Sequence, residues 1–192
     1  LEAHSPISAI IAEKASYQSD AGNKQFDGFW SSSLTDSIEM GMPDIEALDV
    51  SKRLTNIDNI FDVTTKPLIM DLDTGGKSEH FQLNIRTIER LGISAVIIED
   101  KKGLKKNSLF GTDVNQTQEE IDVFSEKILL GKSCRLTSDF MIIASGNSSR
   151  HIQALSEILI DGLKKKGFNN CHLEGRNSND WKLIDAMDII VH

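Results

Sequence analysis

Short apolar runs alternate with longer amphipathic stretches along most of the 192-residue chain. A short apolar run bounded by Gly, Asp or Asn predicts a buried strand, whereas apolar residues three or four positions apart predict a helix. This alternation is typical of β-α units that build a largely parallel sheet. The predicted strands cover residues 26–30, 67–71, 94–99 and 139–144, and three short runs near the end of the chain, 171–173, 181–184 and 188–191.

Three amphipathic stretches predict helices between these strands. The first covers residues 79–91 and ends at Gly92. The last begins at a cap formed by Ser148 or Ser149, and three lysines before Gly167 predict its end, where positive charge complements the helix dipole. The apolar positions of the three helices are, in order, Phe81, Ile85, Ile88 and Leu91; Ile121, Phe124 and Ile128; and Ile152, Leu155, Leu159 and Leu163.

The order of these elements predicts an α/β fold. A complete eight-stranded α/β barrel usually needs about 250 residues, more than this chain has. We therefore expect alternating β-α units that form a partial, unclosed TIM-type barrel or an open, largely parallel sheet, followed by a C-terminal α/β segment. The polar segment 16–25 has no apolar period and predicts a surface loop after the first helix.

Charge and cysteine content narrow the classes of partner. The formal net charge of −8 argues against a surface that neutralises nucleic-acid phosphates. Cys134 and Cys171 lie too far apart for a metal-binding or redox motif and indicate free thiols in a reducing compartment. The sequence shows no apolar run of roughly 18 residues and no signal-peptide pattern. We expect a cytoplasmic protein that binds a small molecule or a protein, without membrane or direct nucleic-acid contacts.

Acidic residues follow two of the predicted strands at their carboxyl ends, where ligands collect in parallel α/β folds. The segment LIMDLDTGGKSEH places Asp71 and Asp73 directly after a strand, Glu99 ends the next strand, and Asp44 lies in an earlier loop. All four are hard oxygen donors of the kind that Mg²⁺ prefers. The sequence leaves open whether they form one magnesium site or are separate loop residues.

Two further polar groups have simple structural explanations. The lysine pair at Lys105 lies in a segment that could fold over a bound anion, but it is equally typical of a solvated loop. Arg150 and His151 are adjacent at a helix start, so their side chains point in different directions. Without a Gly-x-Ser-x-Gly elbow or a Cys-His arrangement, the sequence does not support hydrolase chemistry.

Four stretches of the first three quarters of the chain carry a family resemblance. They read EAHSPISA, FDGFWSSSLTDS, DLDTGG and VIIEDKKGLKKNSLFG. Over residues 1 to about 144 the chain resembles the phosphoenolpyruvate mutase branch of the isocitrate lyase superfamily, whose members read close to E-A-H-x-x-x-S-A, W-x-S-x-L, D-x-D-T-G and E-D-K-x-x-x-K-x-N-S-L. The resemblance implies an α/β barrel and an isomerase that interconverts phosphoenolpyruvate and phosphonopyruvate with Mg²⁺.

The resemblance also assigns roles to residues of this chain. It makes Asp71 the direct metal ligand, with Asp44, Asp73 and Glu99 holding metal-bound water. It places Trp30 and Ser32 against the substrate and the backbone N–H groups near Ser33 and Leu34 against the enolate oxygen. The remaining residues with an implied role form a lid loop, in which Asn107 helps to steer the phosphoryl group: Lys105, Asn107, Ser108 and Leu109.

The resemblance ends abruptly after the strand DFMIIA. Family mutases continue there with an Arg-x-Glu motif, but Ser145 occupies the arginine position. From about residue 137 onward, SDFMIIASGNSSRHIQALSE, LEG and DWKLIDAMDIIVH resemble the ribosomal silencing factor (Iojap-like) family instead. That resemblance implies a module that binds a protein of the large ribosomal subunit and is not an enzyme, with Trp181, Asp185 and His192 in the binding surface.

The two resemblances meet at a strand that either family could supply. We therefore expect a mutase-like partial barrel over residues 1–144, joined to a silencing-factor-like segment over residues 145–192. The simplest explanation is a recombined or joined chain with weakened catalysis, because the arginine and the later barrel strands of the mutases are missing. Binding of a phosphoenolpyruvate-like substrate and binding of the ribosome are the two functions that the sequence leaves open.

Overall fold

The computed structural model describes residues 1–103, 105–106, 117–133, 140–145, 148–178, 181–186 and 189–191, and for 140–145 and 189–191 only the backbone. Its helices are α1 (Pro6–Lys14), α2 (Ser33–Glu39), α3 (Val50–Phe61), α4 (Ser78–Leu91), α5 (Ile121–Ser133) and α6 (Ser149–Lys165). Its strands are β1 (Ser16–Ser19), β2 (Gly22–Gln25), β3 (Phe29–Ser31), β4 (Leu68–Asp71), β5 (Ala95–Glu99), β6 (Lys101–Lys102), β7 (Thr117–Gln118), β8 (Phe140–Ser145), β9 (His172–Glu174), β10 (Leu183–Asp185) and β11 (Ile189–Val191).

Seven strands form one sheet in the order β3-β4-β5-β8-β11-β10-β9. The first five of these strands run parallel, and β10 is antiparallel to both of its neighbours. The seven strands correspond to the seven predicted apolar runs. Because β3 and β9 end the sheet without meeting each other, the barrel does not close, and the predicted open, largely parallel sheet is confirmed.

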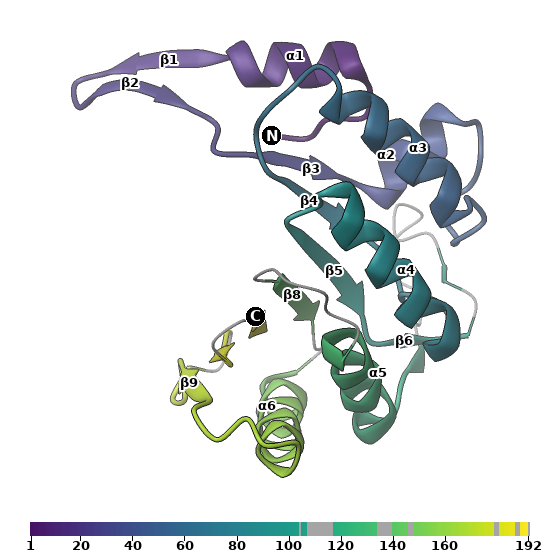
Figure 1. Ribbon diagram of the computed structural model, residues 1–192, viewed down its shortest axis with the longest axis vertical. Coiled ribbons are helices and arrows are strands. Elements are labelled where there is room, and N and C mark those ends of the chain that lie inside the picture. Colours follow the sequence, from purple (N-terminus) through teal and green to yellow (C-terminus); the bar gives the residue numbers. More distant parts are fainter. Residues whose placement is uncertain are drawn as a thin grey trace.

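One face of this sheet is covered by helices. Figure 1 shows α3, α4, α5 and α6 along the outer side of the curved sheet, while its opposite side carries no helix in the described residues. The burial of β4 follows this asymmetry, since Leu68 and Met70 are fully buried and the alternate residues Ile69 and Asp71 are only partly buried. The arrangement is that of an opened half barrel.

The outer helices are formed as the apolar spacing predicts. Phe81, Ile85 and Ile88 are the buried residues of α4, which ends at Gly92 with a φ of 93°. At the start of α6 the Ser148 hydroxyl accepts a hydrogen bond from the backbone N–H of His151, so the predicted cap is confirmed. None of the helices in the described ranges is both long and apolar enough to span a membrane.

The segment 16–25 is a hairpin, and the prediction of a loop there was wrong. β1 and β2 pair antiparallel, from Ser16 opposite Gln25 to Ser19 opposite Gly22, which has a φ of 104°. The hairpin projects away from the sheet (Figure 1), so both of its faces meet solvent. A strand without a buried face has no need for apolar alternation, and the pattern that identifies strands is therefore missing.

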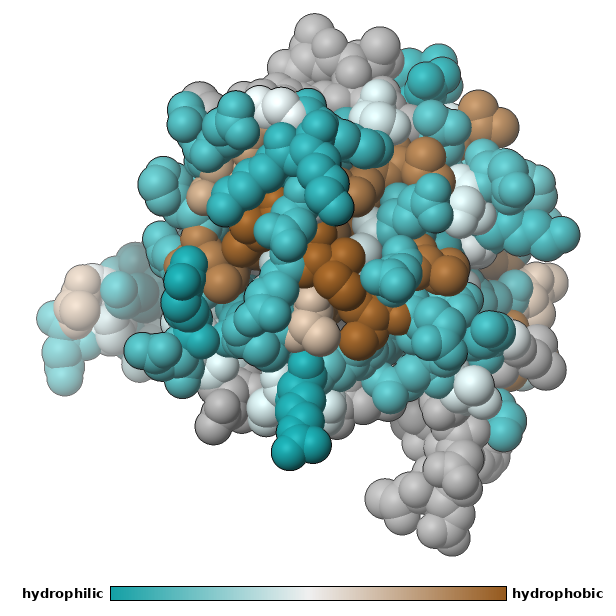
Figure 2. All heavy atoms as spheres, turned by 90° about the horizontal axis from the view of Figure 1, so that it is seen from below, coloured by the Kyte–Doolittle hydropathy of each residue, from teal (hydrophilic) through white to brown (hydrophobic). Residues whose placement is uncertain are grey.

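One apolar core joins the two parts of the chain. Phe124 and Ile128 of α5 belong to the same buried cluster as Leu155 and Leu159 of α6 and the core residues beneath α4. Figure 2 views the molecule from below, the side on which α5 and α6 lie, and shows apolar side chains in a central band with hydrophilic ones around it. The C-terminal segment is thus packed onto the sheet as a continuation of it.

We predict that this shared core makes unfolding cooperative across the whole chain. Leu159 is 2% exposed, and Leu159→Ala should lower the free energy of unfolding by about 2 to 5 kcal/mol. Leu83→Ala, at a side chain that is 60% exposed, is the control and should change it by less than about 0.5 kcal/mol.

Tryptophan fluorescence provides the measurement, because the chain has two tryptophans, Trp30 in the first part and Trp181 in the last. Urea unfolding of the variants Trp30→Phe and Trp181→Phe reports each part separately, and Leu159→Ala should move both transitions together. A shared core would be contradicted if the two tryptophans reported separate unfolding transitions and Leu159→Ala shifted only the transition reported by Trp181.

The turn after β4 allows a second prediction, about glycine. Gly75 and Gly76 both have a positive φ, of 76° and 69°, so alanine at either position should cost about 1 to 2 kcal/mol of backbone strain. At Gly75 an added Cβ would also lie 2.9 Å from the buried ring of Phe81, whereas at Gly76 it would meet nothing within 4 Å. In urea unfolding, Gly75→Ala should therefore lose about 1 to 3 kcal/mol more than Gly76→Ala. Equal losses of stability in the two variants would mean that the Phe81 ring moves aside for the added Cβ without an energetic cost.

Candidate active site

The candidate site lies at the carboxyl ends of β3 and β4, where parallel pairing brings separate loops together. Ser31 of β3 lies beside Met70 of β4, so the residues that follow each strand share one edge of the sheet. Ser33 begins α2 there, Asp71 ends β4, and Asp73 follows in the next turn. The loop between α2 and α3 adds Asp44, and the segment after β6 adds Lys105.

Lys105 is the centre of this arrangement. Its ammonium group donates hydrogen bonds to Asp44 Oδ1 at 2.8 Å, to Ser33 Oγ at 3.0 Å and to Asp73 Oδ1. The Ser33 hydroxyl in turn donates to Asp71 Oδ2 at 2.9 Å. Three of the four predicted metal residues, Asp44, Asp71 and Asp73, are therefore brought together around Ser33 and Lys105.

Burial and charge act in opposite directions on this cluster. Burial raises the pKa of Asp73, and the nearby Lys105 and Arg53 offset only part of that rise. Burial alone would lower the pKa of Lys105, but hydrogen bonds and charge from Asp44 and Asp73 outweigh it and raise that pKa. The lysine is therefore held as a cation.

Arg53 is a site residue that sequence reasoning missed. It lies on α3, is 3% exposed, and its Nε donates to Asp36 Oδ2 at 2.8 Å. Another nitrogen of its guanidinium donates to the backbone oxygen of Asp71 at 2.5 Å and lies 3.7 Å from Asp73 Oδ2. Arg53 thus holds the end of β4 in place through the backbone of Asp71. The sequence gives one indication of this role, because Arg53 is a charged residue next to Leu54, which belongs to the apolar face of its helix.

The turn after β4 is held by several elements. Asp73 has a φ of 56°, and its backbone N–H donates to Asp71 Oδ1 at 3.0 Å. The hydroxyl of Thr74 donates to Glu46 Oε1 at 2.7 Å, and Glu46 also has a positive φ, of 59°. From α5, Lys127 donates to the backbone oxygens of Thr74 and Gly76 at 3.0 and 2.8 Å. Strained residues fixed by so many contacts are typical of functional sites.

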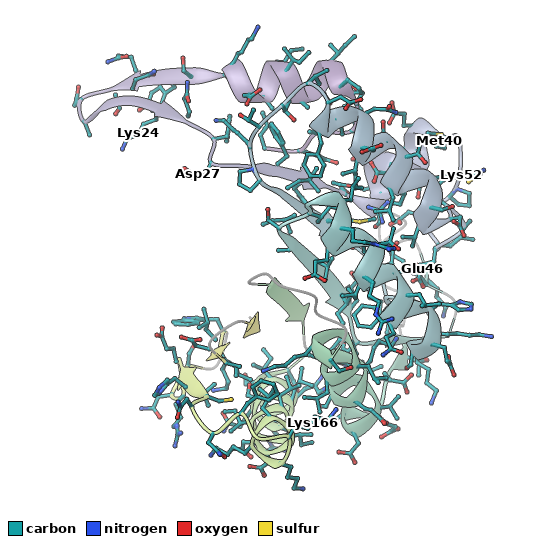
Figure 3. All side chains as sticks on the ribbon, viewed as in Figure 1. Lys24, Asp27, Met40, Glu46, Lys52 and Lys166 are labelled. Atoms are coloured by element: carbon teal, nitrogen blue, oxygen red, sulfur yellow. The ribbon has the colours of Figure 1, made fainter. Side chains whose placement is uncertain are left out.

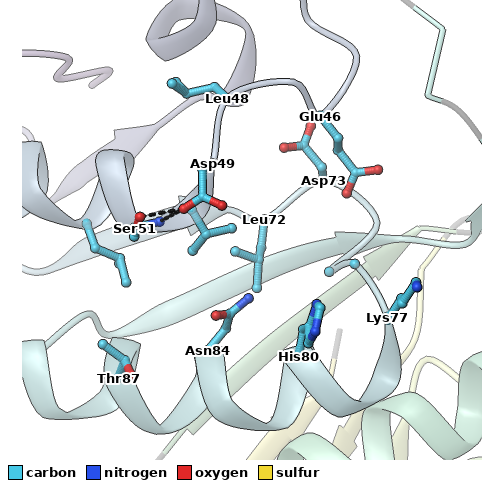
Figure 4. Close-up of a pocket in the computed structure, with 14 residues that line it drawn as sticks. Glu46, Leu48, Asp49, Ser51, Leu72, Asp73, Lys77, His80, Asn84 and Thr87 are labelled. Carbon is cyan, nitrogen blue, oxygen red and sulfur yellow. Dashed lines mark hydrogen bonds between the residues drawn. The ribbon is translucent and has the colours of Figure 1, made fainter.

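A polar pocket of about 510 Å³ borders the same turn. In Figure 4, Glu46 and Asp73 lie on one side of it, and Lys77, which precedes α4, and His80 of α4 lie on the other. It extends the site away from Lys105, between α3 and α4. Its lining residues are Glu46, Leu48, Asp49, Val50, Ser51, Leu54, Leu72, Asp73, Gly75, Gly76, Lys77, His80, Asn84 and Thr87.

The cluster offers the carboxylate oxygens that a hard cation prefers. Asp36, Asp44, Asp71 and Asp73 carry four negative charges against two positive charges on Arg53 and Lys105, which leaves a formal charge of −2. Glu99 lies next to the cluster, since its backbone N–H donates to the backbone oxygen of Asp73 at 2.7 Å, but its carboxylate pairs with Lys101 at 2.6 Å. Among the described residues no three His, Cys, Asp or Glu side chains are close enough to hold a metal ion as they stand, and Lys105 lies between two of them.

The predicted substrate contacts are partly placed by the structure. Trp30 is 43% exposed, and Ser32 is buried at the start of α2. The backbone N–H of Ser33 already has a long hydrogen bond, 3.4 Å, to Asp71 Oδ2. In the register of the sheet, Ser145 lies beside Glu99, so the position of the missing arginine is at the same edge as the site. The lid residues Asn107, Ser108 and Leu109 lie outside the described residues.

The predicted partner-binding residues lie in the last part of the sheet. Trp181 is 46% exposed just before β10, and Asp185 ends that strand. His192 lies outside the described residues.

Arg150 and His151, at the start of α6, point in different directions, as predicted. His151 Nδ1 lies 2.9 Å from Asp100 Oδ2, whereas Arg150 is exposed.

Comparison with known proteins finds two different similarities in this chain. Residues 1–153 match the family model described as phosphoenolpyruvate phosphomutase. The chain is 33% identical over 145 residues to a phosphonopyruvate hydrolase of Variovorax sp. (strain Pal2), covering 75% of this chain and 47% of the relative. Over the same length it is 31% identical to a phosphoenolpyruvate phosphomutase of Tetrahymena pyriformis, covering 45% of that protein.

The C-terminal portion is similar to a different protein. It is 44% identical over 64 residues to the ribosomal silencing factor RsfS of Zymomonas mobilis, covering 33% of this chain and 47% of the relative. The chain thus spans about half the length of the curated relatives that it matches.

Solved structures agree with the first of these similarities. The fold matches a phosphoenolpyruvate phosphomutase from Streptomyces platensis with a TM-score of 0.68 and 28% identity, over 82% of this chain and 55% of that one. It also matches a phosphonopyruvate hydrolase in complex with oxalate and Mg²⁺ at a TM-score of 0.63 and 27% identity, over 82% and 53% of the two chains. With its family model matched over residues 1–153, the chain belongs to the phosphoenolpyruvate phosphomutase family.

Proposed function

We propose that the chain binds Mg²⁺ and interconverts phosphoenolpyruvate and phosphonopyruvate, with weak turnover. The observation that carries this proposal is the convergence of Asp44, Asp71 and Asp73 around Ser33 and Lys105 at the carboxyl ends of two parallel strands. A crystal structure of a related phosphonopyruvate hydrolase contains Mg²⁺ and oxalate, which supports a metal and a small dicarboxylate-like ligand in this family.

In this proposal Asp71 would hold the ion directly, and Asp44, Asp73 and Glu99 would hold it through water. A bound Mg²⁺ supplies positive charge that stabilises an enolate and the oxygens of a transferring phosphoryl group. Arg53 keeps the carboxylates in place through Asp36 and the backbone of Asp71.

Substrate binding is assigned to residues at the same edge. Trp30 and Ser32 would contact the substrate, and the backbone N–H groups of Ser33 and Leu34 would bind the enolate oxygen. Lys105, with Asn107, Ser108 and Leu109, would compensate phosphoryl charge and exclude water, since phosphoryl transfer depends mainly on positioning and charge compensation.

We predict that ligand binding stabilises the protein through this site. Mg²⁺ plus phosphonopyruvate at a hundred times the dissociation constant should raise the free energy of unfolding by about 2.7 kcal/mol. Asp71→Asn removes the charge while keeping the size of the side chain, and should abolish the shift. The matched control is Asp58→Asn, at an exposed acid of α3, which should keep the shift. Thermal melts of the two variants with and without ligand measure the shift. A shift that remains in Asp71→Asn would contradict the assignment of Asp71 as the metal ligand.

We also predict slow turnover, because a serine stands where the family places an arginine. Loss of one charged contact to the transition state costs about 3 to 4 kcal/mol, a factor of roughly a hundred to a thousand in rate. Conversion of phosphonopyruvate, followed by ³¹P NMR beside the Tetrahymena enzyme, should be slower by at least that factor. An equal rate would contradict the importance of the arginine, and no conversion at all would contradict the proposed activity.

A second candidate function is binding of the large ribosomal subunit through the C-terminal segment. Two observations favour it: the similarity of this portion to RsfS proteins, and the exposure of 46% of Trp181, a large apolar side chain beside β10. Exposed aromatic residues are frequent anchors of protein interfaces.

This candidate predicts co-sedimentation with isolated large subunits that Trp181→Ala abolishes. The matched control is Trp30→Ala, which removes the other tryptophan, 43% exposed in the mutase-like part, and should leave sedimentation unchanged. Binding that both variants retain, or that both lose, would contradict a specific role for Trp181.

A further inference from the structure

Lys105 binds two of the carboxylates that the proposed metal site would use. Its side chain is 5% exposed, and its ammonium group contacts Asp44 and Asp73, two of the predicted metal residues. A third contact, to Ser33 Oγ at 3.0 Å, links it to Asp71. An ammonium group has three protons to donate, so these three oxygens satisfy it completely.

A divalent ion bound by the same carboxylates would compete with this lysine. Mg²⁺ prefers carboxylate oxygens and water in an octahedral shell, whereas Lys105 already uses Asp44 Oδ1 and Asp73 Oδ1. The ion would also lie within a few ångströms of the ammonium group, at a buried place where like charges are poorly screened. These two oxygens can therefore accept hydrogen bonds from Lys105 or from the water shell of the ion, but not from both.

The position of Lys105 in the chain makes an exchange feasible. It follows the short strand β6 and is not part of a helix or of the main sheet, so its side chain can leave the cluster without unfolding a core element. Arg53 stays behind on α3 and keeps the carboxylates in place. With Arg53 and Lys105 in place, the cluster has a formal charge of −2. When Lys105 leaves, the charge becomes −3, and a divalent ion would neutralise more than half of it.

We propose that Lys105 is an internal cation that a divalent metal ion must displace, and that the displaced ammonium group then becomes available to the phosphonate or phosphate group of the substrate. This proposal rests on the proposed function and adds an order to it, with metal binding first and anion binding second. Lys105 is then a positioning residue in the metal-free protein. Its presence lowers the affinity for the metal ion.

The first test measures metal affinity by isothermal titration calorimetry with MgCl₂ alone. Lys105→Met removes the competing cation while keeping a long side chain, and should bind Mg²⁺ at least about tenfold more tightly than the parent chain. The matched control, Lys106→Met, removes the same charge from the adjacent exposed lysine and should change the affinity by less than about twofold. A lysine with only a structural role would give the opposite result, because its loss would weaken the site.

The second test uses the unmutated protein and so does not depend on how a variant folds. Lysines are acetylated briefly with acetic anhydride, with and without MgCl₂, and the extent at each lysine is read by mass spectrometry. Lys105 should be protected without the metal and at least about fivefold more reactive with it. Lys127 is the buried control, since it is 9% exposed and bonded to backbone oxygens, and should stay protected.

Exposed lysines serve as internal standards in this experiment. Lys24, Lys52 and Lys166 are exposed, and Figure 3 marks them on the hairpin, on α3 and at the end of α6. Their reactivity should be the same with and without Mg²⁺. An increase at Lys127 as well would mean that the metal loosens the whole structure, and this would overturn a specific exchange.

The outcomes separate this proposal from the proposed function. Equal Mg²⁺ affinity in the parent chain and in Lys105→Met, or bound Mg²⁺ with Lys105 still protected, would overturn the exchange and leave the metal site standing. If neither protein binds Mg²⁺ at millimolar concentrations, the metal site itself is wrong and both proposals fail. Tight binding by Lys105→Met alone, with weak or no binding by the parent chain, supports the exchange.

Discussion

The parallel pairing of β5 with β8 is the interaction on which the rest of the structure depends. These strands pair over five residues, from Ala95 beside Met141 to Glu99 beside Ser145. β8 also pairs with β11, which brings the C-terminal strands into the same sheet. Without β8, the edge of β5 would present unpaired backbone groups, a known aggregation hazard. We propose a boundary between the two parts near residue 144, at the end of this shared strand.

The candidate site also has support of its own, because β3 and β4, at whose carboxyl ends it lies, are at the opposite end of the strand order from β11, β10 and β9. Arg53 of α3, Asp36 of α2 and the end of β4 form one buried network. Buried charges are costly unless each is paired and hydrogen-bonded, and removal of one partner leaves the other uncompensated. The network can therefore persist although the later barrel strands of the family are replaced by a different segment.

The fold could largely be predicted from the sequence, whereas the connections within the site could not. Strand and helix positions follow from local apolar spacing, as at Phe81, Ile85 and Ile88, because burial on one face fixes that spacing. The pairing of Arg53 with Asp36 depends on how α2 and α3 pack, which no local pattern contains. Glu99 illustrates the same limit, since a carboxylate at a strand end is equally able to pair with the nearby Lys101.

The residues proposed for the two candidate functions lie at the same edge of the sheet. β10 runs antiparallel to its neighbours, so Trp181, just before it, lies at the edge where β4 ends in Asp71. Four strand spacings separate β4 from β10, roughly 19 Å along the sheet at about 4.8 Å each. A partner as large as a ribosomal subunit, anchored at Trp181, would extend over the mouth of the mutase-like site. Under the two proposals, ribosome binding and substrate access would therefore compete for one surface.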